Sequence, residues 1–255
     1  MNPQEDMHSI QRTARIAGFL YLLLLPLGVF GILYVPSTLI DPGDVAATSK
    51  NILANAMLFR LSIISALVIP IVNIFVVLFL YQILKPVNQK IAMLMVLFLL
   101  IAVPIAFVNE LTHFAVLLLL GGAQSQTGFT VDQVQALVSL FLGLHEHGIY
   151  TAQIFWGLWL LPMGYLVARS RFLPRVIGIL LIVACFGYLI DSLLFFLYPD
   201  IDFELSSFTF IGEPILGLWL LIKGVDVERW EARATESAEM GPVLGVRDRT
   251  IADPR

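Results

Sequence analysis

Six long apolar segments follow one another along the chain, separated by short polar stretches. A helix needs about twenty apolar residues to cross the hydrocarbon core of a membrane, and all six segments are of that order or longer. They cover residues 14–35, 57–84, 91–120, 134–168, 175–198 and 206–224. The pattern predicts an all-α protein, an integral membrane bundle of six transmembrane helices.

The polar sequence at the two ends divides the chain into three parts. Residues 1–13 are predicted to be a cytoplasmic N-terminal segment, residues 14–224 the six-helix transmembrane domain, and residues 225–255 a cytoplasmic tail. The N-terminal segment is too acidic for the start of a typical signal peptide, so the apolar segment that follows it is predicted to be a retained anchor. The tail mixes charges of both signs with Gly and Pro, and only Trp230 suits a membrane interface. We expect a short helix there, followed by disorder.

Local signals add detail to this architecture. A proline inside a helix removes a backbone donor, so we expect kinks in the apolar segments that contain one. These prolines are Pro26, Pro70, Pro104, Pro162 and Pro214. In the polar connections, Asp44 of "DPGDVAATSKNI" and Thr130 of "GFTVDQVQ" stand where the N-cap of a helix would. The first and third connections are therefore predicted to be partly helical.

Composition supports a membrane protein and argues against several other classes. Hydrophobic residues make up 58% of the 255 residues and charged residues 13%, whereas soluble domains average about half apolar and a quarter charged. The net charge of -4 and the lack of a Lys/Arg block argue against a nucleic-acid partner. The single cysteine, Cys185, can form no intrachain disulfide and no Cys-ligated metal site by itself.

The distribution of basic residues predicts the orientation in the membrane. Lys and Arg are enriched in cytoplasmic connections, and here they gather before the first apolar segment and in every second connection after it. These residues are Arg12, Arg15, Lys85, Lys90, Arg169, Arg171, Arg175, Lys223, Arg229 and Arg233. Both termini are therefore predicted to be cytoplasmic.

Charged and histidine side chains also lie within the apolar segments. Apart from Arg15, Arg175 and Lys223 at the cytoplasmic ends of their segments, these residues fall in the outer half of the membrane in the predicted orientation: Arg60, Glu110, His113, His145, Glu146, His147, Asp191 and Glu213. Four carboxyl groups thus face a single arginine, and an uncompensated carboxylate in hydrocarbon costs several kcal/mol. Protonation, histidine pairing, hydration or a bound cation would each relieve this cost. The alternative is a purely structural role, in which these side chains form interhelical hydrogen bonds that orient the bundle.

Helical spacing decides which of these side chains can act together. Glu110 and His113 are three residues apart and share a helix face, as in the Glu-x-x-His pairs of helical-bundle metal sites. His145 and His147 are two residues apart and cannot both face one site on a regular helix. The spacing therefore allows a metal site made of Glu110, His113 and one of the two histidines. A haem b held between His113 and His145 or His147 is a variant of this hypothesis.

A second polar stripe is predicted beside the histidines. Glu146, Tyr150 and Gln153 recur at helical spacing on the fourth apolar segment, so they form one line along that helix. The stripe is interpreted as a helix-packing or cavity-lining surface. No G-x-S-x-G, Walker or dinucleotide-binding motif is present, so these motifs indicate no nucleophilic or nucleotide chemistry.

Several short motifs resemble one family of membrane proteins. They are "ARIAGFLYLL" (14–23), "PGDVAATSKNI" followed by "LFRL" (42–61), "LYQILKPVNQKIAML" (80–94), "GYLVARSRFLPRVIGILL" (164–181), "GYLIDSL" (187–193) and "GEPILGLWLLIKGV" (212–225). Together they resemble the bacterial family catalogued as domain of unknown function 4386. The resemblance implies a six-helix protein of the bacterial inner membrane. It matches family positions at Arg60, His145, Asp191 and Glu213, and none at Glu110, His113, Glu146 or His147.

Three functions remain open on the sequence alone. The first is binding or transport of a small ligand or cation at a polar pocket open to the extracytoplasmic side. That pocket would be built from Arg60, His145, Asp191 and Glu213, with Glu146, Tyr150 and Gln153 beside them. The second is a structural or accessory subunit with a protein partner. The third is a metal-dependent or redox enzyme using Glu110, His113 and His145 or His147 as ligands.

Overall fold

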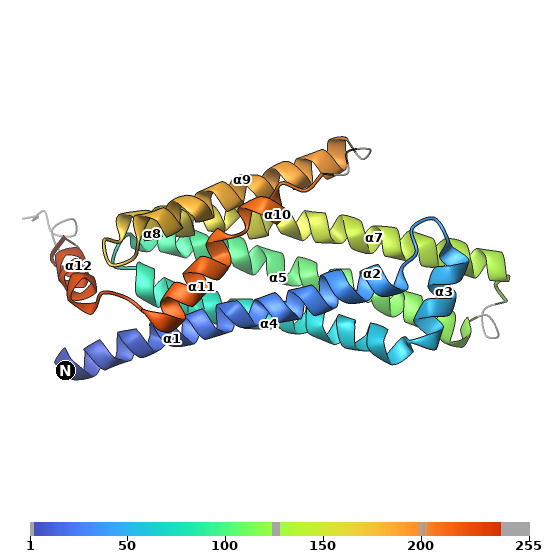
Figure 1. Cartoon of the computed structure of the whole chain (residues 1–255), viewed down its shortest axis with the longest axis horizontal. Coiled ribbons are helices and arrows are strands. Elements are labelled where there is room, and N and C mark those ends of the chain that lie inside the picture. Colours follow the sequence, from blue (N-terminus) through green and yellow to red (C-terminus); the bar gives the residue numbers. More distant parts are fainter. Residues whose placement is uncertain (1–2, 124–127, 199–200, 202, 241–255) are drawn as a thin grey trace, which may run out of the picture.

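Every regular element in the part of the chain that the structure describes is a helix (Figure 1). The structure is a computed structural model, and it describes residues 3–123, 128–198, 201 and 203–240. In chain order the elements are α1 (Pro3–Gly28), η1 (Val29–Tyr34), α2 (Val35–Leu39), α3 (Val45–Ala54), α4 (Ala56–Leu84), α5 (Gln89–Leu118), η2 (Leu119–Ala123), α7 (Val131–Leu158), α8 (Leu160–Arg169), α9 (Arg175–Leu197), α10 (Ser206–Thr209), α11 (Gly212–Ile222) and α12 (Val227–Met240). The predicted all-α membrane bundle is confirmed.

Five of the predicted spans appear as long apolar helices. In the described residues, five helices are long and apolar enough to cross a membrane: Ser9–Leu39, Ala56–Leu84, Gln89–Gly122, Val131–Ser170 and Arg175–Leu197. Their apolar side chains face outward as well as inward, because no water-exposed face has to be polar in a bilayer. The third and fourth, with 34 and 40 residues, are the longest of the five, as the lengths of their apolar segments indicate.

The sixth apolar segment takes a different form. It folds into α10 and α11. Ser206–Ile222 is long enough to cross a membrane only together with Val227–Glu239 of α12, and the two parts are bent by 103°. Pro214 lies in the first turn of α11 and has no N–H to bond to the preceding turn, so the helix breaks between Thr209 and Gly212. This segment is a broken helix and not a regular sixth span.

Proline also explains the break in the fourth span. α7 ends at Leu158 and α8 begins at Leu160. Pro162 cannot donate to the carbonyl oxygen of Leu158, and it therefore lies near the start of a new helix, where its missing N–H costs little. Pro26 precedes the π-helical turn Val29–Tyr34 in the first span.

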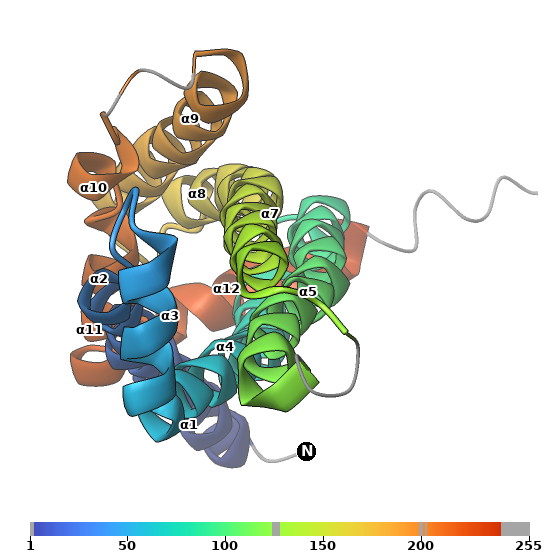
Figure 2. The same ribbon diagram turned by 90° about the vertical axis from the view of Figure 1, so that its right-hand side faces the viewer.

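The helices pack as an up-and-down bundle. α1 lies against α4 and α11, α5 lies against α4 and α7, and α9 lies against α7 and α8. Seen along the bundle axis, α7 lies between α5 and α9 (Figure 2). A polar side chain on α5 or α7 can therefore meet its counterpart on the other helix.

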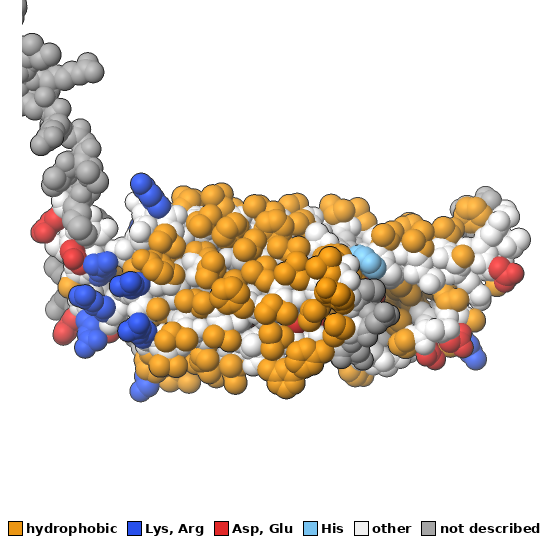
Figure 3. Space-filling model, turned by 90° about the horizontal axis from the view of Figure 1, so that it is seen from above, with side chains coloured by type: hydrophobic (Ala, Val, Ile, Leu, Met, Phe, Trp, Pro, Cys, Tyr) orange, Lys and Arg blue, Asp and Glu red, His pale blue; other side chains and the backbone are white. Residues whose placement is uncertain are grey.

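The two ends of the bundle differ in charge. Lys and Arg side chains gather, together with some Asp and Glu, at the end where α1 begins, beyond a broad hydrophobic belt, whereas the charged side chains at the opposite end are mainly Asp and Glu (Figure 3). We call the first the basic end and the second the distal end. At the basic end, Trp230 of α12 donates from its indole Nε1 to the carbonyl oxygen of Ile83 at 2.8 Å. The predicted tail helix is thus α12, attached to the bundle, while the predicted disorder of 241–255 lies outside the described residues.

Both expected helix caps are present. Asp44 accepts a hydrogen bond from the backbone N–H of Ala47 at the start of α3. Thr130 and Gln133 form a capping box at the start of α7. The first connection therefore contains a helix of its own, whereas in the third connection Thr130 begins the long span itself.

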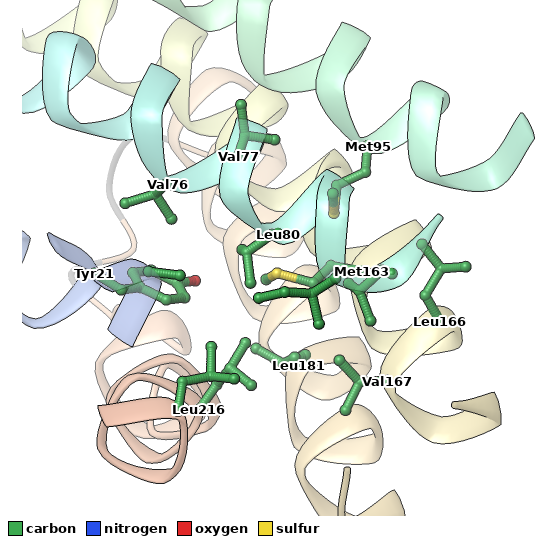
Figure 4. Close-up of a cluster of buried hydrophobic side chains, with 14 of the residues drawn as sticks. Tyr21, Val76, Val77, Leu80, Met95, Met163, Leu166, Val167, Leu181 and Leu216 are labelled. Atoms are coloured by element: carbon green, nitrogen blue, oxygen red, sulfur yellow. The ribbon is translucent and has the colours of Figure 1, made fainter. Parts of the chain in front are cut away.

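The buried apolar side chains form two clusters, with polar side chains between them. The larger cluster lies toward the basic end and includes Tyr21, Leu80, Met163 and Leu216 (Figure 4). The smaller lies toward the distal end. Along α4, α5 and α7, buried polar residues occupy the positions between the two clusters: Ser65, Asn109, Glu110, His113 and Gln153. This polar layer inside the apolar belt holds the candidate site.

Candidate functional site

Three titratable side chains from α5 and α7 converge in the polar layer. Glu110 and His113 lie one turn apart on α5, and His145 faces them from α7. Each offers one ligand atom, and these atoms all lie within 4.8 Å of one another. We call these three residues the histidine cluster.

A glycine on α7 lets the two helices approach at this level. A Cβ atom at Gly148 would lie 1.8 Å from Asn109 Oδ1, so no other residue fits there without moving Asn109. Asn109 Nδ2 in turn donates to the carbonyl oxygen of His145 at 3.0 Å. This interhelical contact sets the depth at which His145 meets Glu110.

The contacts within the histidine cluster are short. Glu110 Oε2 lies 3.5 Å from His113 Nδ1, and Glu110 Oε1 lies 3.8 Å from His145 Nε2. The two imidazole rings are stacked, with centroids 3.4 Å apart and planes at 17°. On its other side, His113 packs on the ring of Phe59.

The cluster is buried, and one of its oxygen atoms has no partner. Glu110 and His113 are each 3% exposed, and the side chain of His145 is 14% exposed. Glu110 Oε2 has no hydrogen bond, and within the described residues no lysine or arginine forms an ion pair with Glu110. A buried polar atom without a partner costs free energy, and a bound cation would remove this cost.

Hydrogen bonds orient the ring of His145. Its Nδ1 lies 3.4 Å from the carbonyl oxygen of Asn109 and 3.3 Å from Thr112 Oγ1. Since the Thr112 hydroxyl donates to that same carbonyl at 2.7 Å, both neighbours of Nδ1 accept a hydrogen bond. These contacts favour the tautomer with the proton on Nδ1, in which the Nε2 lone pair faces Glu110, as is common for metal-binding histidines.

The separations are close to those of a metal site. Zn²⁺ holds imidazole nitrogen and carboxylate oxygen at about 2.1 Å, so tetrahedral ligands lie about 3.4 Å apart. The two Glu110 contacts are near this value. The lone-pair axes of two stacked rings do not converge, so one imidazole must rotate for both to bind the same ion.

A second polar cluster surrounds Glu213 at the start of α11. The hydroxyl of Tyr21 on α1 donates to Glu213 Oε2 at 2.7 Å, and the hydroxyl of Tyr188 on α9 donates to Oε1 at 2.8 Å. The carboxyl group borders a cavity of about 190 Å³. The cavity lining also includes Trp156 and Trp159.

The two clusters adjoin each other through a smaller cavity. That cavity, of about 20 Å³, is bordered by Asn109 and Glu110, and it is large enough for about one water molecule. Ile32, Ile69, Asn73, Leu99 and Trp156 border both cavities. Glu110 and Glu213 thus border two adjoining cavities, whose shared wall is apolar except for Asn73.

Comparison with known proteins identifies the family. The model of the family described as domain of unknown function (DUF4386) matches residues 16–224. The chain belongs to the DUF4386 family. An uncharacterised protein of Archaeoglobus fulgidus is 31% identical over 163 residues, which cover 64% of this chain and 83% of that protein. No solved structure matches the chain.

The four residues that the sequence motifs suggested as one site lie in different surroundings. His145 belongs to the histidine cluster, and Glu213 borders the larger cavity. Asp191 is buried on α9 and accepts hydrogen bonds from the backbone N–H groups of Leu205 and Ser206, both at 2.7 Å. Arg60 is exposed on α4 and makes no ion pair within the described residues. The structure does not bring these four residues into one pocket.

The predicted stripe on α7 also divides. Glu146 is exposed, Tyr150 donates to Glu204 at 2.9 Å, and Gln153 donates to the carbonyl oxygen of Tyr188 at 3.2 Å. These contacts connect α7 to α9 and to the segment after it. They place Tyr150 and Gln153 at a helix-packing surface, which is one of the two interpretations that the spacing allows.

His147 points away from the histidine cluster. It is exposed, its Nδ1 donates to the carbonyl oxygen of Gly143 at 2.8 Å, and its ring packs edge-on against Phe195. The two-residue spacing of His145 and His147 therefore has the predicted effect, and the structure selects His145 as the partner of Glu110 and His113.

Several residues of the site have no signal in the sequence. Tyr21 and Tyr188 are amphipathic residues that occur throughout membrane helices, and nothing in their spacing relates them to Glu213. Asn109 and Thr112 flank Glu110 and could have been noticed as polar residues in an apolar segment. Their role in orienting His145 requires the packing of α5 on α7.

Proposed function

We propose that this multi-pass membrane protein binds one divalent transition-metal ion at the histidine cluster. The observation that carries the proposal is the convergence of Glu110, His113 and His145, with their ligand atoms within 4.8 Å and an oxygen of Glu110 buried without a hydrogen bond. Two imidazoles and one carboxylate are a ligand set that suits Zn²⁺ and neighbouring first-row ions. The ion would also neutralise the buried carboxylate, which no arginine or lysine does within the described residues.

Three protein ligands leave one position of a tetrahedral ion open. Structural zinc sites use four protein ligands, whereas catalytic sites use three and leave the fourth to water or substrate. Here the small cavity beside Glu110 would hold the fourth ligand. This favours an ion that acts on, or binds, a small molecule, so metal-dependent enzyme activity is the second candidate function.

The arrangement argues against the haem variant. A haem held by two histidines requires the macrocycle to lie between the imidazoles. The rings of His113 and His145 are stacked with centroids 3.4 Å apart, which leaves no room for one. A single ion needs only the rotation of one ring.

Metal analysis of the purified protein in detergent tests the proposal. After treatment with a chelator and dialysis against Zn²⁺ or Co²⁺, we expect about one equivalent of metal and a higher thermal stability, since binding to the folded state stabilises it. Glu110→Gln and His145→Ala should each lower the metal affinity at least tenfold. His147→Ala is the matched control on the same helix and should bind as the wild type does.

Two results would contradict the metal site. One is less than a tenth of an equivalent of any transition metal in a protein whose stability does not respond to chelator. The other is stoichiometric binding that survives in His113→Ala and His145→Ala. In either case the histidine cluster would be an interhelical hydrogen-bonding group, and an accessory role with a protein partner would become the better hypothesis.

We also propose that the bundle lies in the inner membrane of a bacterial cell and that its basic end faces the cytoplasm. The support is the concentration of Lys and Arg at that end (Figure 3), which the positive-inside rule associates with the cytoplasm. Both termini would then be cytoplasmic, and the polar layer would lie toward the extracytoplasmic side.

Cysteine labelling of intact cells tests this orientation. In a Cys185→Ser background, Lys50→Cys at the distal end and Lys85→Cys at the basic end provide matched exposed positions. A membrane-impermeant maleimide should label the protein with Lys50→Cys and should label Lys85→Cys only after lysis. Labelling of Lys85→Cys in intact cells would reverse the orientation.

A further inference from the structure

The cavity beside Glu213 combines aromatic walls with one carboxyl group. Five of its lining residues are aromatic: Tyr21, Trp156, Trp159, Tyr188 and Phe210. Its volume of about 190 Å³ exceeds the ~150 Å³ of an apolar cavity that takes up benzene. A molecule with one aromatic ring and a few further atoms therefore fits.

Among the described residues, no positive group offsets Glu213. Lysine, arginine and histidine are absent from the described lining of this cavity, and none forms an ion pair with Glu213 within the described part of the chain. Its two hydrogen bonds come from Tyr21 and Tyr188, whose hydroxyls donate one to each oxygen. A carboxylate held this way in a membrane interior favours a bound cation.

The aromatic side chains determine what kind of cation suits the cavity. A cation over the face of Trp or Tyr is attracted by the ring quadrupole, and this attraction grows when water is excluded. A hydrated metal ion would gain little from such walls, because the described lining offers one carboxylate and no imidazole. We propose that the cavity binds a small hydrophobic organic ammonium ion, with its charge at Glu213 and its apolar part against Trp156 and Trp159.

The position of the cavity gives such a ligand a route of entry. Leu25 on α1 and Phe210, just before α11, line the cavity and are also exposed on the apolar outer surface. Gly28 on α1 also lines the cavity and has no side chain to narrow it. The cavity thus opens sideways between α1 and the α10–α11 segment, where lipid surrounds the bundle, and an ammonium compound with an apolar body can enter from the bilayer.

This proposal is independent of the metal site. It rests on Glu213 and the aromatic lining, and none of Glu110, His113 and His145 contacts the ligand in it. Loss of metal binding in the cluster variants would leave it unchanged, and failure of ammonium binding would leave the metal proposal unchanged.

Phenyltrimethylammonium and tert-butylbenzene form a matched pair of probes, since they have the same shape and differ in charge. We expect saturable binding of phenyltrimethylammonium to the purified protein in detergent, measured by calorimetry and by quenching of tryptophan fluorescence. tert-Butylbenzene should bind at least tenfold more weakly. Because the probe carries a permanent charge, its affinity reports on the protein and not on its own protonation.

Variants separate the cavity from nonspecific binding to the micelle. Glu213→Gln keeps the size of the side chain and removes the charge, so it should lower the affinity for phenyltrimethylammonium at least tenfold. Trp156→Leu should lower it several-fold through loss of the aromatic face. Glu204→Gln changes an exposed carboxylate elsewhere on the bundle and should leave the affinity unchanged.

Three outcomes would overturn the proposal. They are no saturable binding at millimolar probe, equal affinity for the neutral isostere, and wild-type affinity in folded Trp156→Leu or Glu213→Gln protein. If Glu213→Gln does not fold, Trp156→Leu and the comparison of the two probes decide the question alone.

Discussion

Asp191→Ala is expected to destabilise the folded protein by about 3 kcal/mol, measured by thermal or denaturant unfolding in detergent. Both carboxylate oxygens of Asp191 accept backbone N–H groups, those of Leu205 and Ser206, at 2.7 Å. Hydrogen bonds to charged groups contribute about 1.5–3 kcal/mol each. The alanine variant would leave both N–H groups without an acceptor in a partly buried position, and the start of α10 would no longer be held against α9.

The matched control is Asp44→Ala. Asp44 also accepts a backbone N–H at a helix start, but it is exposed and makes one such bond, to Ala47. Its removal should cost about 1 kcal/mol. Equal stability of Asp191→Ala and the wild type, with loss of ammonium binding, would show instead that Asp191 contacts the ligand.

Five of the six helices could be predicted from the sequence because their existence depends on local composition alone. A segment of about twenty apolar residues has few other stable states in a bilayer. The sixth segment has the same composition, yet it is broken. Its form depends on Pro214 and on the distant carboxylate of Asp191, which holds the N-terminal end of α10 from another helix. A hydropathy pattern gives little weight to the single proline, and it contains no information about the contact with Asp191.

The candidate site was predictable where two residues share one helix. The spacing of Glu110 and His113 indicates a shared face, and the spacing of His145 and His147 indicates that only one of them can join it. Which one joins depends on the rotation of α7 against α5, and this is set by the contact of Asn109 with Gly148.

The neighbours of Glu213 were harder to predict from the sequence. The residue itself is conspicuous as a carboxyl group in an apolar segment. Its two donors, Tyr21 and Tyr188, come from helices far from it in the sequence. Grouping Glu213 with Arg60, His145 and Asp191 followed from the resemblance to one family and from their common depth, and residues at one depth can still face different sides of their helices.

Gly18→Val is expected to cost about 3 kcal/mol of stability and to weaken binding of phenyltrimethylammonium. α1 and α11 lie so close at Gly18 that a Cβ atom there would be 2.5 Å from the backbone N of Leu221 and 2.6 Å from the backbone O of Gly217. Backbone atoms cannot move aside as a side chain can, so the two helices must separate, and overpacking of this kind typically costs 1–3 kcal/mol.

The same separation would reach the cavity. Tyr21 lies one turn after Gly18 on α1, and Glu213 lies one turn before Gly217 on α11, so moving the helices apart lengthens the hydrogen bond between Tyr21 and Glu213, now 2.7 Å. Gly143→Val is the matched control, because a Cβ atom there would have no neighbour within 4 Å. Its free energy of unfolding should be within about 0.5 kcal/mol of the wild-type value, and its binding of phenyltrimethylammonium should be unchanged. An equal loss in both variants would mean that the effect of Gly18→Val comes from the helix backbone and not from the close contact of α1 with α11.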